Sequence, residues 1–152
     1  MFIGAAENPF ADPPEWRVVR LAKKVKAGAD FIQTQCIFNI DKFEQFMTRA
    51  RDMGLTDTVS ILAGITPLKN AGMARYMSTK VAGIDIPDEI INRISALSKE
   101  DQPREGIKIA VETIERVREM EGVAGVHLMA IEWEEKVPEI LNAAGIAKRP
   151  EI

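Results

Sequence analysis

The sequence predicts an α/β fold made of four strand–helix units, and two observations lead to this prediction. Four short apolar stretches are bounded by turn residues, as buried strands are, and amphipathic helical stretches separate them. Such alternation is typical of parallel strands joined by right-handed crossovers. The expected strands are Phe2–Ala6, Asp30–Phe38, Thr58–Ile65 and Val126–Ile131.

Each expected helix carries apolar residues spaced three and four positions apart, which is the pattern of a helix with one buried face. The helix after the second strand has Asp41 at its expected N-cap and Gly54 at its end. Two helices, rather than one, are expected between the third and fourth strands. In chain order, the helical stretches are Val18–Val25, Phe43–Ala50, Asn70–Lys80, Pro87–Leu97, Ile107–Val117 and Val137–Ala144.

The composition excludes several classes of protein. The 152 residues carry 20 Lys and Arg against 23 Asp and Glu, and a net charge of −3 gives no electrostatic footprint for nucleic acid. No apolar run approaches the ~20 residues of a membrane span, and the N-terminus lacks the basic region of a secretory signal. One cysteine, Cys36, and one histidine, His127, disfavour a disulfide or a Cys/His metal site. We expect one α/β domain over residues 1–152, cytoplasmic and without a metal.

Four units make only half of a (β/α)8 barrel, which usually needs about 250 residues. An open four-stranded parallel sheet with helices on one side would leave one face and both edges uncovered, whereas parallel sheets are almost always covered on both faces. Either the helices cover both faces, or the chain is half of a barrel that needs another half. The pattern of apolar residues leaves both alternatives open.

The second strand holds the most informative polar residues. Side chains alternate between the two faces of a strand, so Gln33 and Gln35 share the face opposite to Ile32 and Cys36. A buried amide without a partner costs roughly 1–3 kcal/mol. The two glutamines therefore form either a polar layer satisfied by neighbouring strands and water, or a pair of amides directed at the donors and acceptors of a heterocyclic ligand.

The helix after the first strand has a basic face with Arg17, Arg20 and Lys24 at helical spacing, and Lys23 and Lys26 lie nearby. This face could bind a pyrophosphate through charge-assisted hydrogen bonds, although a solvated helix face is the commoner explanation of such a run. Met73 and Met77 lie one helical turn apart and suit either core packing or the wall of a flat ligand's pocket.

Two further residues lie in or after the last expected strand. Trp133 could stack on a ring system or serve as a hinge or core residue. His127 lies within the strand and faces away from Leu128. An interior histidine with satisfied hydrogen bonds is favoured there over a catalytic base.

The segment from Ala27 to Gln35, A-G-A-D-F-I-Q-T-Q, resembles the methylenetetrahydrofolate reductase family, in which a lysine-containing helix leads into an A-G-A-x-x-x-x-T-Q strand. Gly64–Pro67, Gly72–Tyr76 and Gly125–Met129 are similar to later segments of that family, in the same order. The resemblance covers nearly the whole chain. It implies the second half of a (β/α)8 TIM barrel, strands five to eight.

The resemblance also implies a function. The family is a flavin-dependent oxidoreductase of one-carbon metabolism, in which FAD passes reducing equivalents from an electron donor to 5,10-methylenetetrahydrofolate and forms the 5-methyltetrahydrofolate used in methionine biosynthesis. Gln35 corresponds to a substrate-contacting glutamine, with Gln33, Met73, Met77 and Trp133 as further candidates for the folate pocket. The candidates for FAD binding are Ala6, Asn8, Arg20, Lys23 and Lys24.

The glutamate that serves as the family's acid belongs to the first half of the barrel, and no residue here matches it. Opening the folate's five-membered ring needs a positioned acid. The isolated chain is therefore expected to be inactive and to need the other half-barrel or a homo-oligomer. A non-catalytic half-barrel that self-associates as an assembly module is the alternative.

Overall fold

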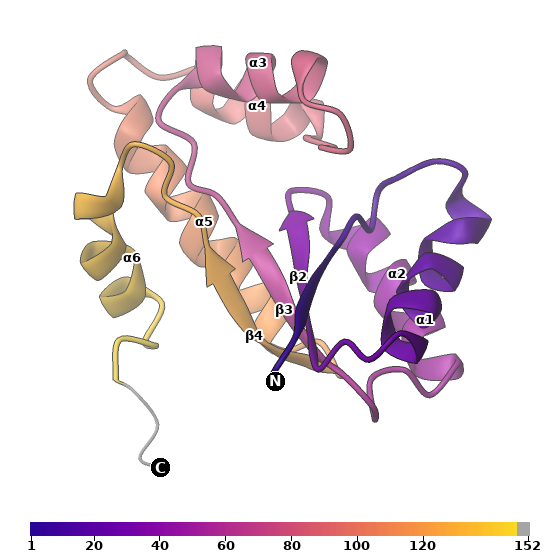
Figure 1. The fold of residues 1–152 in the computed structure, drawn as a ribbon. Helices are drawn as coiled ribbons and strands as arrows, with labels where there is room; N and C mark the ends of the chain where they lie inside the picture. Colours follow the sequence, from indigo (N-terminus) through magenta and orange to yellow (C-terminus); the bar gives the residue numbers. More distant parts are fainter. Residues whose placement is uncertain (149–152) are drawn as a thin grey trace.

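The computed structural model describes residues 1–148. Four strands alternate with helices along the chain, and two of the helices stand above the ends of the strands (Figure 1). The strands are β1 (Gly4–Glu7), β2 (Phe31–Cys36), β3 (Ser60–Ile65) and β4 (Val123–Leu128). The α-helices are α1 (Arg17–Lys26), α2 (Ile40–Asp52), α3 (Ala71–Lys80), α4 (Asp88–Ser95), α5 (Gln102–Arg118) and α6 (Val137–Ala143), and short 3-10 turns, η1 (Pro14–Trp16) and η2 (Glu134–Lys136), precede α1 and α6.

The four strands form one parallel sheet in the order β1-β2-β3-β4. Within the described residues, β1 and β4 are its two unpaired edges. Because all strands run in the same direction, the loops at their carboxyl ends gather at one rim of the sheet. Four βα units in this order have the architecture of half of a (β/α)8 barrel, as the sequence predicts.

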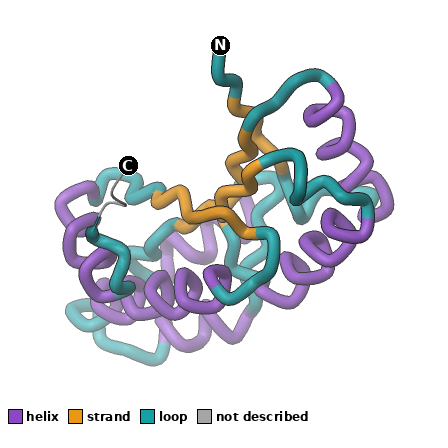
Figure 2. Tube along the Cα trace, turned by 90° about the horizontal axis from the view of Figure 1, so that it is seen from below, coloured by secondary structure: helices purple, strands orange, loops and turns teal. Residues whose placement is uncertain are grey.

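The helices α1, α2, α5 and α6 lie on one side of the curved sheet, and no described helix covers the other side (Figure 2). We call this uncovered side the open face. The main core lies between the helices and the sheet, where Ile32, Ile61 and Phe43 have no exposed surface. Of the two arrangements that the sequence left open, the structure shows the one-sided one.

The helices α3 and α4 form a separate layer above the strand ends (Figure 1). Three contacts fix it there. Gly106 of α5 lies so close to the loop after β3 that a Cβ there would come within 1.7 Å of the Leu68 carbonyl oxygen. A Cβ on Gly83, in the loop between α3 and α4, would lie 1.7 Å from the Asn8 side chain. Asp85, in the same loop, forms an ion pair with Lys42 of α2.

Two local predictions need correction. The last strand is Val123–Leu128 rather than Val126–Ile131. It begins directly after Gly122, whose positive φ of 88° makes the turn, and Gly125 within it lacks the apolar side chain by which a strand is recognised. The N-cap of α2 is Asn39, whose side chain accepts a hydrogen bond from the Lys42 N–H, and not Asp41, which lies within the first turn.

Candidate functional site

A cavity of about 410 Å³ opens at the carboxyl end of the open face. Strands β1, β2 and β4, the loop after β1 and helix α1 contribute its walls. Active sites of (β/α) barrels lie at this end of the strands. The lining residues are Ala6, Glu7, Asn8, Ala11, Arg20, Lys24, Gln33, Thr34, Gln35, His127 and Met129.

Both glutamines of β2 line this cavity, on the face opposite to Ile32 and Cys36. The Gln35 side-chain oxygen accepts a hydrogen bond from the Cys36 N–H at 3.1 Å, which leaves its amide nitrogen without a partner among residues 1–148. The Gln33 side chain makes no hydrogen bond within the same range. Each glutamine therefore has an amide group free to bind a ligand.

Lys24 reaches the cavity from α1, but its charge is already balanced. Its Nζ lies 2.7 Å from a carboxylate oxygen of Glu7 and donates to the Ala6 carbonyl oxygen at 2.6 Å. Glu7 is 4% exposed, and its other carboxylate oxygen accepts a hydrogen bond from the Asn8 N–H. The sequence alone gives no indication of this pair, because α1 must first pack beside β1 to form it.

Arg20 and Asn8 stand at the rim of the cavity. The Arg20 guanidinium donates to the Asp12 carbonyl oxygen at 2.8 Å and has no carboxylate partner in the described structure. Asn8 accepts a hydrogen bond from the Phe10 N–H at 2.9 Å and so shapes the loop after β1. Of the two cations in the cavity, Arg20 is the one whose charge is available to an anionic ligand.

His127 is the residue that the sequence prediction undervalued. Its Nδ1 is a buried side-chain nitrogen without a hydrogen-bond partner among residues 1–148, so the histidine is not the satisfied interior residue that was expected. Beside it, Met129 lies over Gly64, where a Cβ would come within 2.9 Å of the Met129 methyl group. Val126 and Leu128 pack against the core. Because side chains alternate between the two faces of a strand, this pattern in the sequence places His127 on the open face.

Four predicted site residues lie outside this cavity. Met77 belongs to a second apolar cluster and is 6% exposed, and Met73 packs against this cluster. Lys23 lies over the Trp16 ring, 5.7 Å from its centroid. Trp133 lines a different cavity. The structure thus brings together Ala6, Asn8, Arg20, Lys24, Gln33 and Gln35 but not these four.

Cys36 faces away from the cavity, among the residues of the second apolar cluster. Its Sγ lies 3.0 Å from the Thr66 hydroxyl, and burial raises the pKa of the thiol. A protonated, buried thiol is a poor nucleophile. Cys36 is therefore a packing residue.

Residues 1–148 contain no group of three or more His, Cys, Asp and Glu side chains arranged to hold a metal ion. None of their helices combines the length and the apolar character needed to cross a membrane.

A parallel half-barrel with a polar cavity at the carboxyl ends of its strands places the chain among the (β/α)-barrel proteins. The chain belongs to the methylenetetrahydrofolate reductase family, because the family model described as "Methylenetetrahydrofolate reductase" matches residues 5–145. A solved structure of an uncharacterized protein from Clostridium thermocellum, described as binding two copies of 5-methyl-5,6,7,8-tetrahydrofolic acid, has the same fold. It matches with a TM-score of 0.64 and 17% sequence identity over 95% of this chain and 52% of that one.

Curated relatives agree with the family assignment. A probable methylenetetrahydrofolate reductase (NADPH) from Caenorhabditis elegans is 27% identical over 152 residues, which cover 96% of this chain. Methylenetetrahydrofolate reductase 2 from Schizosaccharomyces pombe is 29% identical over 93% of the chain, and methylenetetrahydrofolate reductase (NADH) 1 from Arabidopsis thaliana is 29% identical over 87%. In each case the chain spans 22% of the relative's length.

Proposed function

We propose that this chain forms the C-terminal half of a methylenetetrahydrofolate reductase barrel, which reduces 5,10-methylenetetrahydrofolate to 5-methyltetrahydrofolate when the barrel is complete. The observation that carries the proposal is the set of unpartnered groups on the open face: the amides of Gln33 and Gln35 and the buried Nδ1 of His127. Unpaired polar groups at a barrel's interior favour a ligand with several ring donors and acceptors. A reduced pterin is such a ligand.

The cavity suits FAD in part. Arg20 is the cation free to hold a phosphate, and Ala6 and Asn8 supply backbone and side-chain groups beside it. Lys24 instead stabilises the buried Glu7, and Lys23 lies outside the cavity. When bound, the flavin supplies the hydride. The protein's own residues bind and orient the ligands and exclude water from one side of the cavity.

The cavity offers no unpaired carboxylate within residues 1–148. Glu7 is the one carboxylate among its described lining residues, and it forms an ion pair with Lys24. We therefore propose that residues 1–152 alone do not catalyse the reaction. The acid comes from the partner that covers the open face, whether that is another half-barrel or a second copy.

Aromatic side chains on the open face, Phe2 and Phe31, favour a partner that covers them. Phe2 is 76% exposed and stacks on Phe31 with ring centroids 5.4 Å apart. A non-catalytic half-barrel that self-associates through this face and the edges of β1 and β4 is the second candidate function. The two candidates differ in whether a flavin and a folate bind.

The deciding experiment adds a separately expressed N-terminal half-barrel of a family member to this chain and measures FAD binding and 5-methyltetrahydrofolate formation. Activity in the mixture, with none in either half alone, is expected. Gln35→Ala should then weaken folate binding by about tenfold, since one hydrogen bond to the ligand is worth roughly 1.5 kcal/mol. Gln45→Ala, on the exposed side of α2, is the matched control and should change nothing. Stable self-association without flavin or folate binding would instead establish the non-catalytic function.

A further inference from the structure

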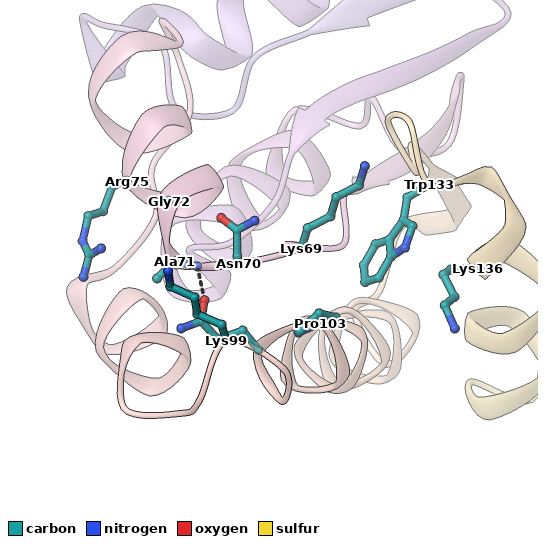
Figure 3. Close-up of a pocket in the computed structure, with 10 residues that line it drawn as sticks. Lys69, Asn70, Ala71, Gly72, Arg75, Lys99, Pro103, Trp133 and Lys136 are labelled. Carbon is teal, nitrogen blue, oxygen red and sulfur yellow. Dashed lines mark hydrogen bonds between the residues drawn. The ribbon is translucent and has the colours of Figure 1, made fainter.

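A second cavity has a volume of about 640 Å³ (Figure 3). It opens between the loops that follow β3 and β4 and the amino-terminal ends of α3 and α5. Three segments build it: residues 69–75, 99–103 and 133–136. None of its lining residues belongs to the cavity that contains Gln35.

The charged side chains of residues 1–148 that line this cavity are all positive. They are Lys69, Arg75, Lys99 and Lys136, and no aspartate or glutamate of the described residues lines it. Lys69 donates to the Glu132 carbonyl oxygen at 2.6 Å and Arg75 to the Ser95 hydroxyl at 2.7 Å, so neither hydrogen bond neutralises a charge.

The remaining two cations differ. Lys136 is paired with Glu139 at 2.8 Å, whereas Lys99 has no ion pair among the described residues. Within residues 1–148, three of the four positive charges therefore have no ion pair. The four cations come from three separate segments of the chain and line one cavity, an arrangement that favours a ligand with more than one negative charge.

The amino-terminal end of α3 adds an independent donor. The Asn70 side chain accepts the Met73 N–H at 2.8 Å, and Gln102 accepts the Ala71 N–H at 3.0 Å (Figure 3). The Gly72 N–H between them makes no hydrogen bond within residues 1–148, and Gly72 is exposed and lacks a Cβ that would shield it. A free amide at a helix N-terminus favours an anion, because the helix dipole adds partial positive charge there.

An aromatic wall limits the cavity on the side of the loop after β4. Trp133 is 9% exposed, and Figure 3 shows its ring between Lys69 and Lys136, beside Pro103. The ring excludes water from one side of the cationic space. Exclusion of water strengthens the attraction between the lysines and an anion.

We propose that this cavity binds a ligand with two or more phosphate groups. Three uncompensated cations and the free amide of Gly72 carry the proposal. Phosphate is favoured over carboxylate because the loops after the last two strands of (β/α) barrels, together with a helix N-terminus, frequently form phosphate sites. The proposal goes beyond the proposed function, since it uses no residue of the Gln35 cavity.

The test uses pyrophosphate as the probe and the full chain with Trp16→Phe, so that Trp133 is the remaining tryptophan. Titration should change the fluorescence of Trp133 saturably and shift the ¹⁵N–¹H resonance of Gly72. Lys99→Glu should weaken binding at least about tenfold, because it removes one charge-assisted contact and adds a repulsion. Lys80→Glu, at the opposite end of α3, makes the same charge change outside the cavity and should leave the affinity unchanged.

Several outcomes would overturn the proposal. The first is that neither Trp133 nor Gly72 responds to pyrophosphate. The second is that Lys80→Glu weakens binding as much as Lys99→Glu, which would indicate general attraction to positive charge. Equal affinity for citrate would overturn the assignment to phosphate. Circular dichroism confirms that each variant is folded, and the test is independent of flavin and folate binding.

Discussion

His127 carries a polar atom that the fold of this chain leaves unsatisfied. A buried nitrogen without a partner costs about 1–3 kcal/mol, and an apolar ring of similar size removes that cost. His127→Phe should therefore raise the free energy of unfolding by about 1 kcal/mol, measured by urea denaturation, while it weakens folate binding in the completed barrel. A clear loss of stability would show that the ring nitrogen has a partner in solution.

Gly83 is the residue through which the α3–α4 layer contacts Asn8. It has a φ of +78°, and a Cβ there would lie 1.7 Å from the Asn8 side-chain nitrogen. Gly83→Ala should lower the free energy of unfolding by more than the ~1–2 kcal/mol that the left-handed backbone alone costs.

Gly145→Ala is the matched control for this variant. Gly145 has a φ of +66°, with nothing within 4 Å of the added Cβ. Thermal denaturation of both variants separates the contact from the backbone strain. Equal losses would mean that the loop moves freely away from Asn8.

At the scale of elements, an ion network ties α4 to α5. Arg93 contacts Glu105 and makes a bidentate pair with Glu112, at 2.6 and 2.9 Å. The hydrogen bonds from Arg93 lower the pKa of Glu112. A carboxyl whose pKa is lowered in the folded state stabilises the protein above its unfolded pKa and loses this contribution as the pH falls through the folded pKa.

Arg93→Gln should therefore lower the free energy of unfolding by on the order of 1 kcal/mol at pH 7, since the pair is partly exposed. The difference from the parent chain should begin to shrink as the pH falls through the ordinary pKa of glutamate, about 4.3, and should be lost once the pH has fallen through the lowered pKa of Glu112 in the folded parent. Urea denaturation at pH 7, 5 and 3 measures this difference. A difference that is constant across this pH range would exclude the network as its source.

The order and the type of the elements could be predicted from the sequence, because apolar periodicity reflects which face of each element is buried. The period of two in β2 also places Gln33 and Gln35 correctly on the open face. Strand ends were less predictable: Gly125 interrupts the apolar signal of β4, and a turn at Gly122 moves its start.

The composition of the site could be predicted only in part. The pairing of Lys24 with Glu7 depends on how α1 packs against β1, a contact between segments 17 residues apart. Trp133 was placed correctly after β4 and named as a candidate for the folate pocket, but it lines a different cavity, together with Lys69 and Lys99 from distant parts of the chain. Long-range packing decides both, and periodicity carries no information on it.

At the scale of the whole molecule, the open face should govern association. Phe31 lies on this face beneath Phe2, outside the main core. If another half-barrel or a second copy covers the face, Phe31→Asp should weaken that association by about 2 kcal/mol or more, since it places a charge in a desolvated contact.

Sedimentation velocity over a range of concentrations measures the effect, with Trp16→Asp as the control. Trp16 is also exposed, but it lies before α1 on the side of the helices. Its replacement should leave association unchanged. Association that persists in Phe31→Asp would show that another surface joins the subunits.

The separation of the apolar core from the open face has an evolutionary consequence. Ile32, Ile61 and Phe43 hold the sheet to its helices from behind, whereas Gln33, Gln35 and His127 contribute little to that packing. Substitutions on the inner wall can therefore accumulate without unfolding the scaffold. Related proteins that keep the residues between the sheet and the helices can therefore change the residues of the open face and bind a different ligand.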